Sequence, residues 1–266
     1  MSVFASGENS MVFAFRKKTK APDNQKGTVL IMKKIALILA LALAVSLAAC
    51  SKKAEEAPEE TPVDGEQQEE VTPEVKDETP AEVAPTIGTL TVPNIYKNEY
   101  LGITAKFPNA GDNKWDCETN EENLATNGFT KKADGNYEAQ MKKADSIQDF
   151  YAKSNKNAIV SVILDNIAVP ATDDKMSESD YVAATIAALP TSLAKQGVFD
   201  AEIDTAEVNF AGQQREAITV TGSRNGIKMY QKQVIYKQDD YMVVVTVTTS
   251  TNDDTTSILN LFTSIK

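Results

Sequence analysis

Two cysteines are the strongest candidate nucleophiles in this sequence, and their surroundings differ. Cys50 ends an apolar run, whereas Cys117 stands between Asp116 and Glu118. Neighbouring carboxylates raise the pKa of a thiol, so we interpret Cys117 as inert. The chain has no histidine, which excludes His-dependent triads and zinc sites that use His. Any chemistry on Cys50 must therefore be of another kind.

Other residues with catalytic potential have simpler structural explanations. Ser192 and Lys195 match a Ser-x-x-Lys acyl-enzyme pattern, but the companion Ser-Asp-Asn and Lys-Thr-Gly motifs are missing. Three acidic pairs, Asp173-Asp174, Asp239-Asp240 and Asp253-Asp254, stand at expected turns or ahead of a helix, where N–H groups favour anions. We expect no enzymatic activity, no cofactor and no metal site.

The charge of the chain excludes one class of partner. Its 266 residues carry a formal net charge of −11, and no basic stripe occurs after residue 92. Nucleic-acid binding depends on clustered Lys and Arg that neutralise phosphates. The sequence therefore predicts no nucleic-acid partner.

A secretion signal precedes Cys50. Residues 32–49 consist of Met32-Lys33-Lys34 followed by an apolar stretch, Ile35 to Ala49. This is the order of a signal peptide, a charged region before an apolar one. The apolar stretch is shorter than the roughly 20 residues that a membrane-spanning helix needs. Residues 1–31 do not fit this plan, and we expect them to be an upstream extension before a true start at Met32; an extended signal is the alternative.

The end of this signal, Leu47-Ala48-Ala49-Cys50, resembles a bacterial lipobox. The resemblance implies cleavage before Cys50 and attachment of lipid to its thiol. Two or more acyl chains would anchor the protein stably in membrane lipid. We therefore expect a lipid-anchored protein on the extracytoplasmic face of the cell membrane; an ordinary signal with an unmodified Cys50 is the alternative.

Residues 50–92 have the composition of a disordered linker. Between Ser51 and Val92 there are twelve Asp and Glu, three Lys, five Pro and no aromatic residue. Such a segment buries too little apolar surface to offset its ordering entropy. We interpret it as an acidic tether that sets the reach of the domain; a partner-binding or calcium-collecting tail is the alternative.

Residues 93–266 have the composition of one globular domain. The sequence predicts short strands at 95–101 and 103–107, a hairpin at 149–153 and 158–165, and a helix that begins at Ser177 and ends at Gly197. Pro190 should kink or split that helix. Residues 116–146 have no clear pattern.

The last seventy residues predict an antiparallel meander. Its expected strands are 203–210, 214–221, 227–237 and 241–250, and Asn225-Gly226 is typical of a type I′ turn. Ile258, Leu261, Phe262 and Ile265 have the spacing of one helical face, which predicts a terminal helix across the sheet. The fold class is α+β, mostly antiparallel β-sheet with packed α-helices.

One strand of this meander is a candidate contact surface. Lys228, Tyr230, Lys232 and Tyr236 have the even spacing of one strand face. Aromatic and basic side chains together can form a protein-binding surface, but a half-exposed sheet face has the same pattern. Both interpretations stay open.

The opening of the domain resembles a known group of proteins. Residues 94–103, with Phe107-Pro108 and Trp115, are similar to the start of small Gram-positive lipoproteins, and the order of strands is similar to the PsbP-like fold. The resemblance covers most of residues 93–266 and implies an α/β/α sandwich with an accessory or assembly role. It carries no catalytic residues, and a fold does not define a function.

These observations predict a non-catalytic module on a lipid anchor. It would bind an envelope protein or a cell-wall component. The alternative is a small-ligand receptor associated with a transporter, although such receptors usually need a larger two-lobed chain.

Overall fold

The computed structural model describes residues 84–168 and 176–265. The signal peptide, with Leu47, Ala48 and Ala49, and the lipidation site Cys50 lie outside these residues. So do residues 1–31 and Asp173-Asp174. The expectations for these segments stay predictions.

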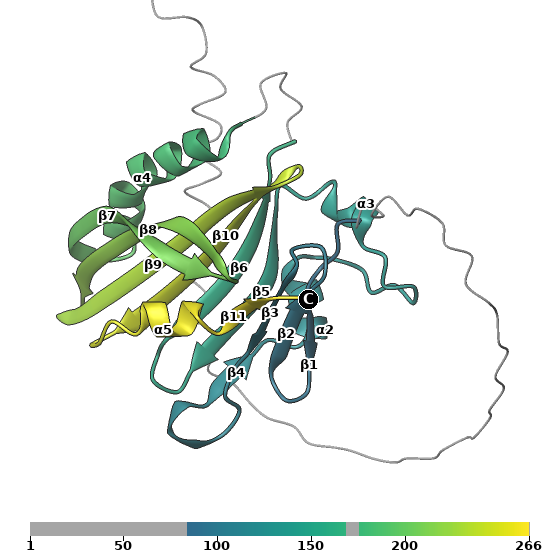
Figure 1. Ribbon diagram of the computed structural model, residues 1–266, viewed down its shortest axis with the longest axis horizontal. Coiled ribbons are helices and arrows are strands. Elements are labelled where there is room, and N and C mark those ends of the chain that lie inside the picture. The colour runs from purple at the N-terminus through teal and green to yellow at the C-terminus, as the bar shows by residue number, and fades with distance from the viewer. Residues whose placement is uncertain (1–83, 169–175, 266) are drawn as a thin grey trace, which may run out of the picture.

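A seven-stranded antiparallel sheet forms the centre of the domain (Figure 1). In spatial order its strands are β4 (Trp115–Cys117), β5 (Ser146–Ser154), β6 (Ile159–Asn166), β10 (Tyr241–Ser250), β9 (Ile227–Gln238), β8 (Gln213–Arg224) and β7 (Val198–Phe210). The predicted hairpin and the predicted meander are both confirmed.

Local turn chemistry sets the register of the meander. Asn225 and Gly226 have φ of 52° and 77°, and they connect Arg224 directly to its partner Ile227. Both central residues of a type I′ turn need positive φ, which Asn and Gly tolerate best. The turn therefore aligns β8 with β9, as the sequence predicted.

A second, four-stranded sheet packs on one face of the large sheet. Its order is β1 (Thr89–Thr91), β2 (Ile95–Asn98), β3 (Ile103–Lys106) and β11 (Phe262–Ser264). Helix α4 (Glu178–Lys195) covers the opposite face (Figure 1). Successive side chains of β10 point to opposite faces of the large sheet, so this strand contributes to the core on both sides. Val243 and Val245 pack toward the small sheet, and Met242 and Val244 pack toward α4.

Helix α4 begins and ends where the sequence predicts. The Ser177 side chain accepts a hydrogen bond from the backbone N–H of Asp180 at 3.1 Å. Gly197, with φ of 73°, follows the last turn. Pro190 stands on an exposed position, and the helix runs through it as one element, so the predicted split does not occur.

The predicted terminal helix is wrong over most of its length. Helix α5 covers only Thr255–Leu259, and Phe262 to Ser264 form strand β11, which pairs with β3. The Phe262 ring lies 5.3 Å from that of Phe210 and 6.0 Å from that of Phe107 in the core. These residues form a strand and not a helix for two reasons. The edge of β3 offers them backbone hydrogen bonds, and the aromatic side chains of the core surround the Phe262 ring.

The folded domain also begins before the predicted boundary at Pro93. Strand β1 pairs with β2, and Gly88 donates its backbone N–H to Asp149 Oδ1 at 2.7 Å. The Asn98 side chain donates to the carbonyl of Thr86 at 3.1 Å. Residues 84–92 therefore belong to the domain and not to the linker.

Residues 111–146, which include the region that had no clear pattern, hold short elements. They are η2 (Gly111–Asn113), β4, α2 (Asn120–Thr126) and α3 (Glu138–Met141). Thr119 and Glu122 form a capping box at the start of α2. No helix within residues 84–168 and 176–265 is both long and apolar enough to cross a membrane.

Candidate functional site

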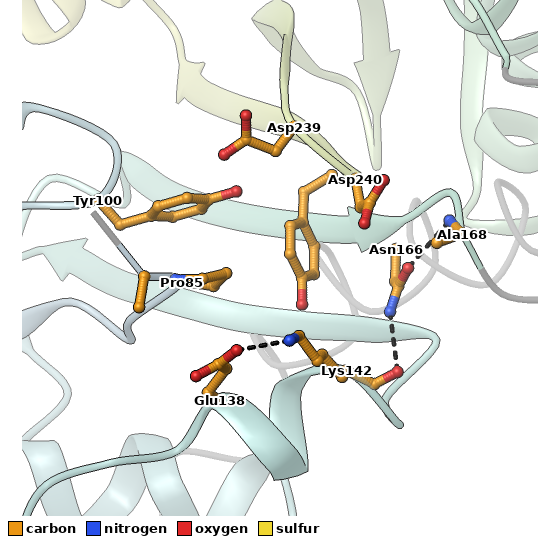
Figure 2. Close-up of a pocket in the computed structure, with 10 residues that line it drawn as sticks. Pro85, Tyr100, Glu138, Lys142, Asn166, Ala168, Asp239 and Asp240 are labelled. Atoms are coloured by element: carbon orange, nitrogen blue, oxygen red, sulfur yellow. Dashed lines mark hydrogen bonds and ion pairs between the residues drawn. The ribbon is translucent and has the colours of Figure 1, made fainter. Parts of the chain in front are cut away.

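A pocket of about 580 Å³ opens at one end of the two sheets (Figure 2). Its lining comes from five separate parts of the chain: Ala84 and Pro85, Tyr100, Glu138 and Lys142, Asn166 and Ala168, and Asp239, Asp240 and Tyr241. Below, the tyrosine pocket means this set of residues. Its volume is in the range of about 300–1,000 Å³ that small-molecule sites occupy.

Two tyrosines form the aromatic part of the pocket. Tyr100 lies in the loop between β2 and β3, which Asn98 holds by accepting the Leu101 N–H at 2.9 Å. Tyr241 is the first residue of β10, directly after the Asp239-Asp240 turn. The two rings meet edge to face, with centroids 6.2 Å apart and planes at 83°. The walls are therefore preformed.

Burial raises the pKa of both phenols. Tyr100 and Tyr241 are 4% and 2% exposed. Burial, and next the charge of Asp240, raises the pKa of Tyr241 to about 12. Burial, followed by Asp239, raises the pKa of Tyr100 even further. At neutral pH both hydroxyls carry their protons, so neither is poised as a base.

The two hydroxyls differ in their hydrogen bonds. Tyr100 donates to the backbone carbonyl of Gln238 at 3.2 Å. The Tyr241 hydroxyl forms no hydrogen bond with any residue that the structure describes. Asn166, by contrast, donates to the Lys142 carbonyl at 3.3 Å and accepts from the Ala168 N–H at 3.0 Å. Tyr241 therefore offers an open polar group to a ligand.

The pocket has a negative balance. Figure 2 shows Asp239 and Asp240 at the top of the pocket, and Glu138 and Lys142 at the opposite side, below. Lys142 Nζ and Glu138 Oε1 form an ion pair at 2.5 Å. No Lys or Arg in the described part of the chain pairs with Asp239 or Asp240. Asp239 Oδ2 accepts a hydrogen bond from Gln238 Nε2 at 3.5 Å, and the charge of Lys142 also acts on Asp240, so the balance is negative but not free of partners.

The predicted contact surface is split by the structure. Tyr236 is 4% exposed and packs between the sheets, with the Arg215 Cζ 4.2 Å from its ring centroid, so it forms no part of a surface. Lys232 Nζ donates to Thr256 Oγ1 of α5 at 2.5 Å. Lys228 and Tyr230 remain together, with the ammonium 5.2 Å from the ring centroid. That pair keeps the contact surface as a smaller prediction.

The thiol of Cys117 has a raised pKa, as predicted, but burial and not its acidic neighbours is the main cause, and Glu118 does not contribute. The side chain is 9% exposed and forms no disulfide. Burial first, and the charge of Asp116 second, raises the pKa of the thiol to about 12. The interpretation as an inert thiol is confirmed in its direction.

The sequence did not point to the tyrosine pocket. The sequence predicted Tyr100 near the end of a strand, and Asp239-Asp240 in a turn. In the structure the turn is present, and Tyr100 lies just after the end of strand β2. Nothing local connects Tyr100 to Tyr241, because only the packing of the two sheets brings β10 beside the β2–β3 loop. The one local feature that could have indicated the pocket is the position of two acidic residues, Asp239 and Asp240, directly before the aromatic residue Tyr241.

Three solved structures illustrate the similarity of this chain to known proteins. Cyanobacterial PsbP (CyanoP) from Synechocystis is 13% identical over 71% of this chain and 98% of its own, with a TM-score of 0.35. LpqN, involved in cell envelope biogenesis of Mycobacterium tuberculosis, is 12% identical to this chain. The match covers 60% of this chain and 82% of LpqN, with a TM-score of 0.31. A Pseudomonas aeruginosa protein of unknown function is 17% identical over 34% of this chain, with a TM-score of 0.23, and the match spans 58% of its length.

These similarities do not assign an activity. All three TM-scores are below 0.5, so the α+β class follows from the strand pairing itself, and the resemblance to PsbP-like proteins stays a prediction. No protein-family model and no curated protein matches this sequence.

Proposed function

We propose that this protein is a lipid-anchored, extracytoplasmic binding module that uses the tyrosine pocket to engage an envelope protein or a cell-wall component, without catalysis. One observation carries the proposal. Ala84 and Pro85, the first described residues, line the pocket, so the chain that leads from Cys50 enters the domain at the binding site.

This arrangement suits an anchored module. An anchor confines the domain to a thin layer above the membrane, where binding to another envelope component becomes effectively intramolecular. A modest affinity is then sufficient. A tether of residues 50–83 would span on the order of 30 Å if flexible, and more if its charges repel one another.

Crosslinking in cells tests the proposal. A photo-reactive amino acid replaces Lys142, an exposed residue of the pocket, or Glu207, an exposed residue of β7 that serves as a control. We expect a specific crosslinked product from position 142 and none from 207. Equal products from both positions, or none from 142, would contradict a partner at the pocket.

The same assay tests the anchor and the tether. Cys50→Ala should prevent lipidation, and deletion of residues 55–80 should shorten the reach while Ala84 and Pro85 stay in place. At matched expression, both changes should lower the yield at position 142. Equal yields from all three proteins would argue against an anchored module.

A small-ligand receptor is the second candidate function. The volume of the pocket, about 580 Å³, favours it. A thermal-shift screen of small molecules on the purified protein separates the two: stabilisation by a small molecule that also abolishes the crosslink would favour the receptor.

A further inference from the structure

We propose that the tyrosine pocket binds a positively charged organic group, an ammonium or guanidinium on a short apolar stem. The inference rests on the proposed function only for the source of this group, which we take to be a Lys or Arg side chain of the partner protein. A free small cation has the same chemistry, and the experiment below distinguishes the two.

The charges of the pocket select the sign of the ligand. Its three carboxylates face a single ammonium, which gives a formal charge of −2. Because Lys142 forms an ion pair with Glu138 at 2.5 Å, the positive charge of Lys142 attracts an anion only weakly. Within residues 84–168 and 176–265, neither Asp239 nor Asp240 forms an ion pair, although Lys142 acts on Asp240 at longer range. A cation is attracted here and an anion is repelled.

The aromatic walls select an organic cation over a bare metal ion. Tyr100, Tyr241 and Pro85 supply aromatic and apolar carbon atoms to the lining of the pocket. Ring faces attract alkylammonium and guanidinium groups, and they also cover an apolar stem. A hard metal ion would instead need several oxygen ligands in close array.

The hydroxyl of Tyr241 is a polar group that the pocket can offer to such a ligand. Its side chain is 2% exposed and lines the pocket, yet the hydroxyl has no partner within the described residues. The hydroxyl oxygen is not among the buried side-chain atoms that lack a partner, so it is open to a ligand or to water at the pocket. Ammonium and guanidinium groups carry several N–H donors and can satisfy the phenol oxygen and a carboxylate together.

The test uses the full-length lipidated protein in detergent and paired probes. N-acetyl-arginine methylamide and N-acetyl-lysine methylamide carry the charge, whereas the citrulline and norleucine analogues keep the shape without it. Binding is measured by calorimetry and by NMR signals of labelled tyrosines. We expect the charged probes to bind at least about tenfold more tightly than the neutral ones, and added salt to weaken them.

Variants place the effect in the pocket. The double variant Asp239→Asn, Asp240→Asn removes both of these charges, and Asn tolerates the φ of 49° at position 239. It should weaken the charged probes at least about tenfold. Tyr241→Phe keeps the ring and should weaken them about threefold or more. Glu207→Gln, an exposed carboxylate on β7, makes a matched charge change and should have no effect.

The outcomes separate this inference from the proposed function. Equal binding of charged and neutral probes, or binding that Asp239→Asn, Asp240→Asn leaves unchanged, overturns the cationic ligand even if the crosslink at position 142 survives. Charged probes that bind while no protein is crosslinked at 142 support the cation site but overturn the protein source, and indicate a free small cation. Loss of the crosslink in the double variant supports both.

Discussion

The backbone N–H of Gly88 donates a hydrogen bond to Oδ1 of Asp149 at 2.7 Å, across 61 residues of sequence. Asp149 is 1% exposed and also accepts from the Tyr96 hydroxyl at 2.5 Å and from Asn98 Nδ2 at 3.0 Å. A buried carboxylate is costly unless such donors surround it. The segment before Pro93 thus completes a hydrogen-bond network inside the domain.

Removal of this segment should destabilise the fold. A chain of residues 93–266 lacks β1 and the Gly88 donor, whereas one of residues 84–266 keeps both. Loss of one hydrogen bond to a buried acceptor costs about 1–3 kcal/mol, so the shorter chain should have a lower free energy of unfolding. Urea denaturation followed by circular dichroism measures it. If the two chains unfolded at the same urea concentration, residues 84–92 would not contribute to the fold, and the domain would begin at Pro93 as the sequence predicted.

A single methyl group at position 88 should have a related effect. A Cβ added to Gly88 would contact Cε2 of the buried Tyr96 and lie 2.7 Å from Asp149 Oδ2. Neither neighbour has free space, so Gly88→Ala should cost about 1–3 kcal/mol through overpacking. Thr89→Ala, one residue further on an exposed position, is the matched control and should change stability little. The comparison fails if both variants unfold at the same urea concentration.

The buried tyrosines should make the protein sensitive to alkali. The raised pKa of Tyr241, about 12, means that the folded protein keeps a proton that the unfolded chain releases near its ordinary pKa of 10.0. This contribution to stability is complete below pH 10 and is lost as the pH rises toward 12. The free energy of unfolding should therefore fall by up to about 1.4 kcal/mol per pH unit for this tyrosine.

Tyr241→Phe isolates that contribution. The variant should show a shallower loss of stability above pH 10, while its difference from the wild type stays constant between pH 7 and 9, because no phenol titrates there. Urea denaturation at each pH gives the slopes, and absorbance at 295 nm reports phenolate formation. Parallel curves for the two proteins from pH 7 to 11 would contradict the raised pKa of Tyr241.

Cys117 should resist alkylation in the folded protein. Its pKa, raised from 9.0 to about 12, lowers the thiolate fraction, and burial blocks access. At pH 8 iodoacetamide should modify it at least about a hundredfold more slowly than in urea. Mass spectrometry counts the adduct. Asp116→Asn removes only the second cause and should accelerate labelling slightly; a large acceleration would mean that charge, and not burial, protects the thiol.

Elements with local signals were predictable from the sequence. Asn225-Gly226 defines its turn by backbone preference alone, and Ser177 with Gly197 marks both ends of α4, so these features need no distant contact. The inert character of Cys117 also follows in part from its neighbour Asp116. The whole meander depends on such short-range information, since its strands are joined by two-residue turns.

Tertiary structure decided what depends on distant partners. Phe262 has helical spacing in the sequence, but β3 and the aromatic core draw it into a strand. Residues 84–92 have the composition of the linker, yet the buried Asp149 and strand β2 hold them in the domain. Tyr100 and Tyr241 form one pocket only because two sheets pack together. Each of these outcomes depends on contacts between segments far apart in the chain, and no local propensity contains that information.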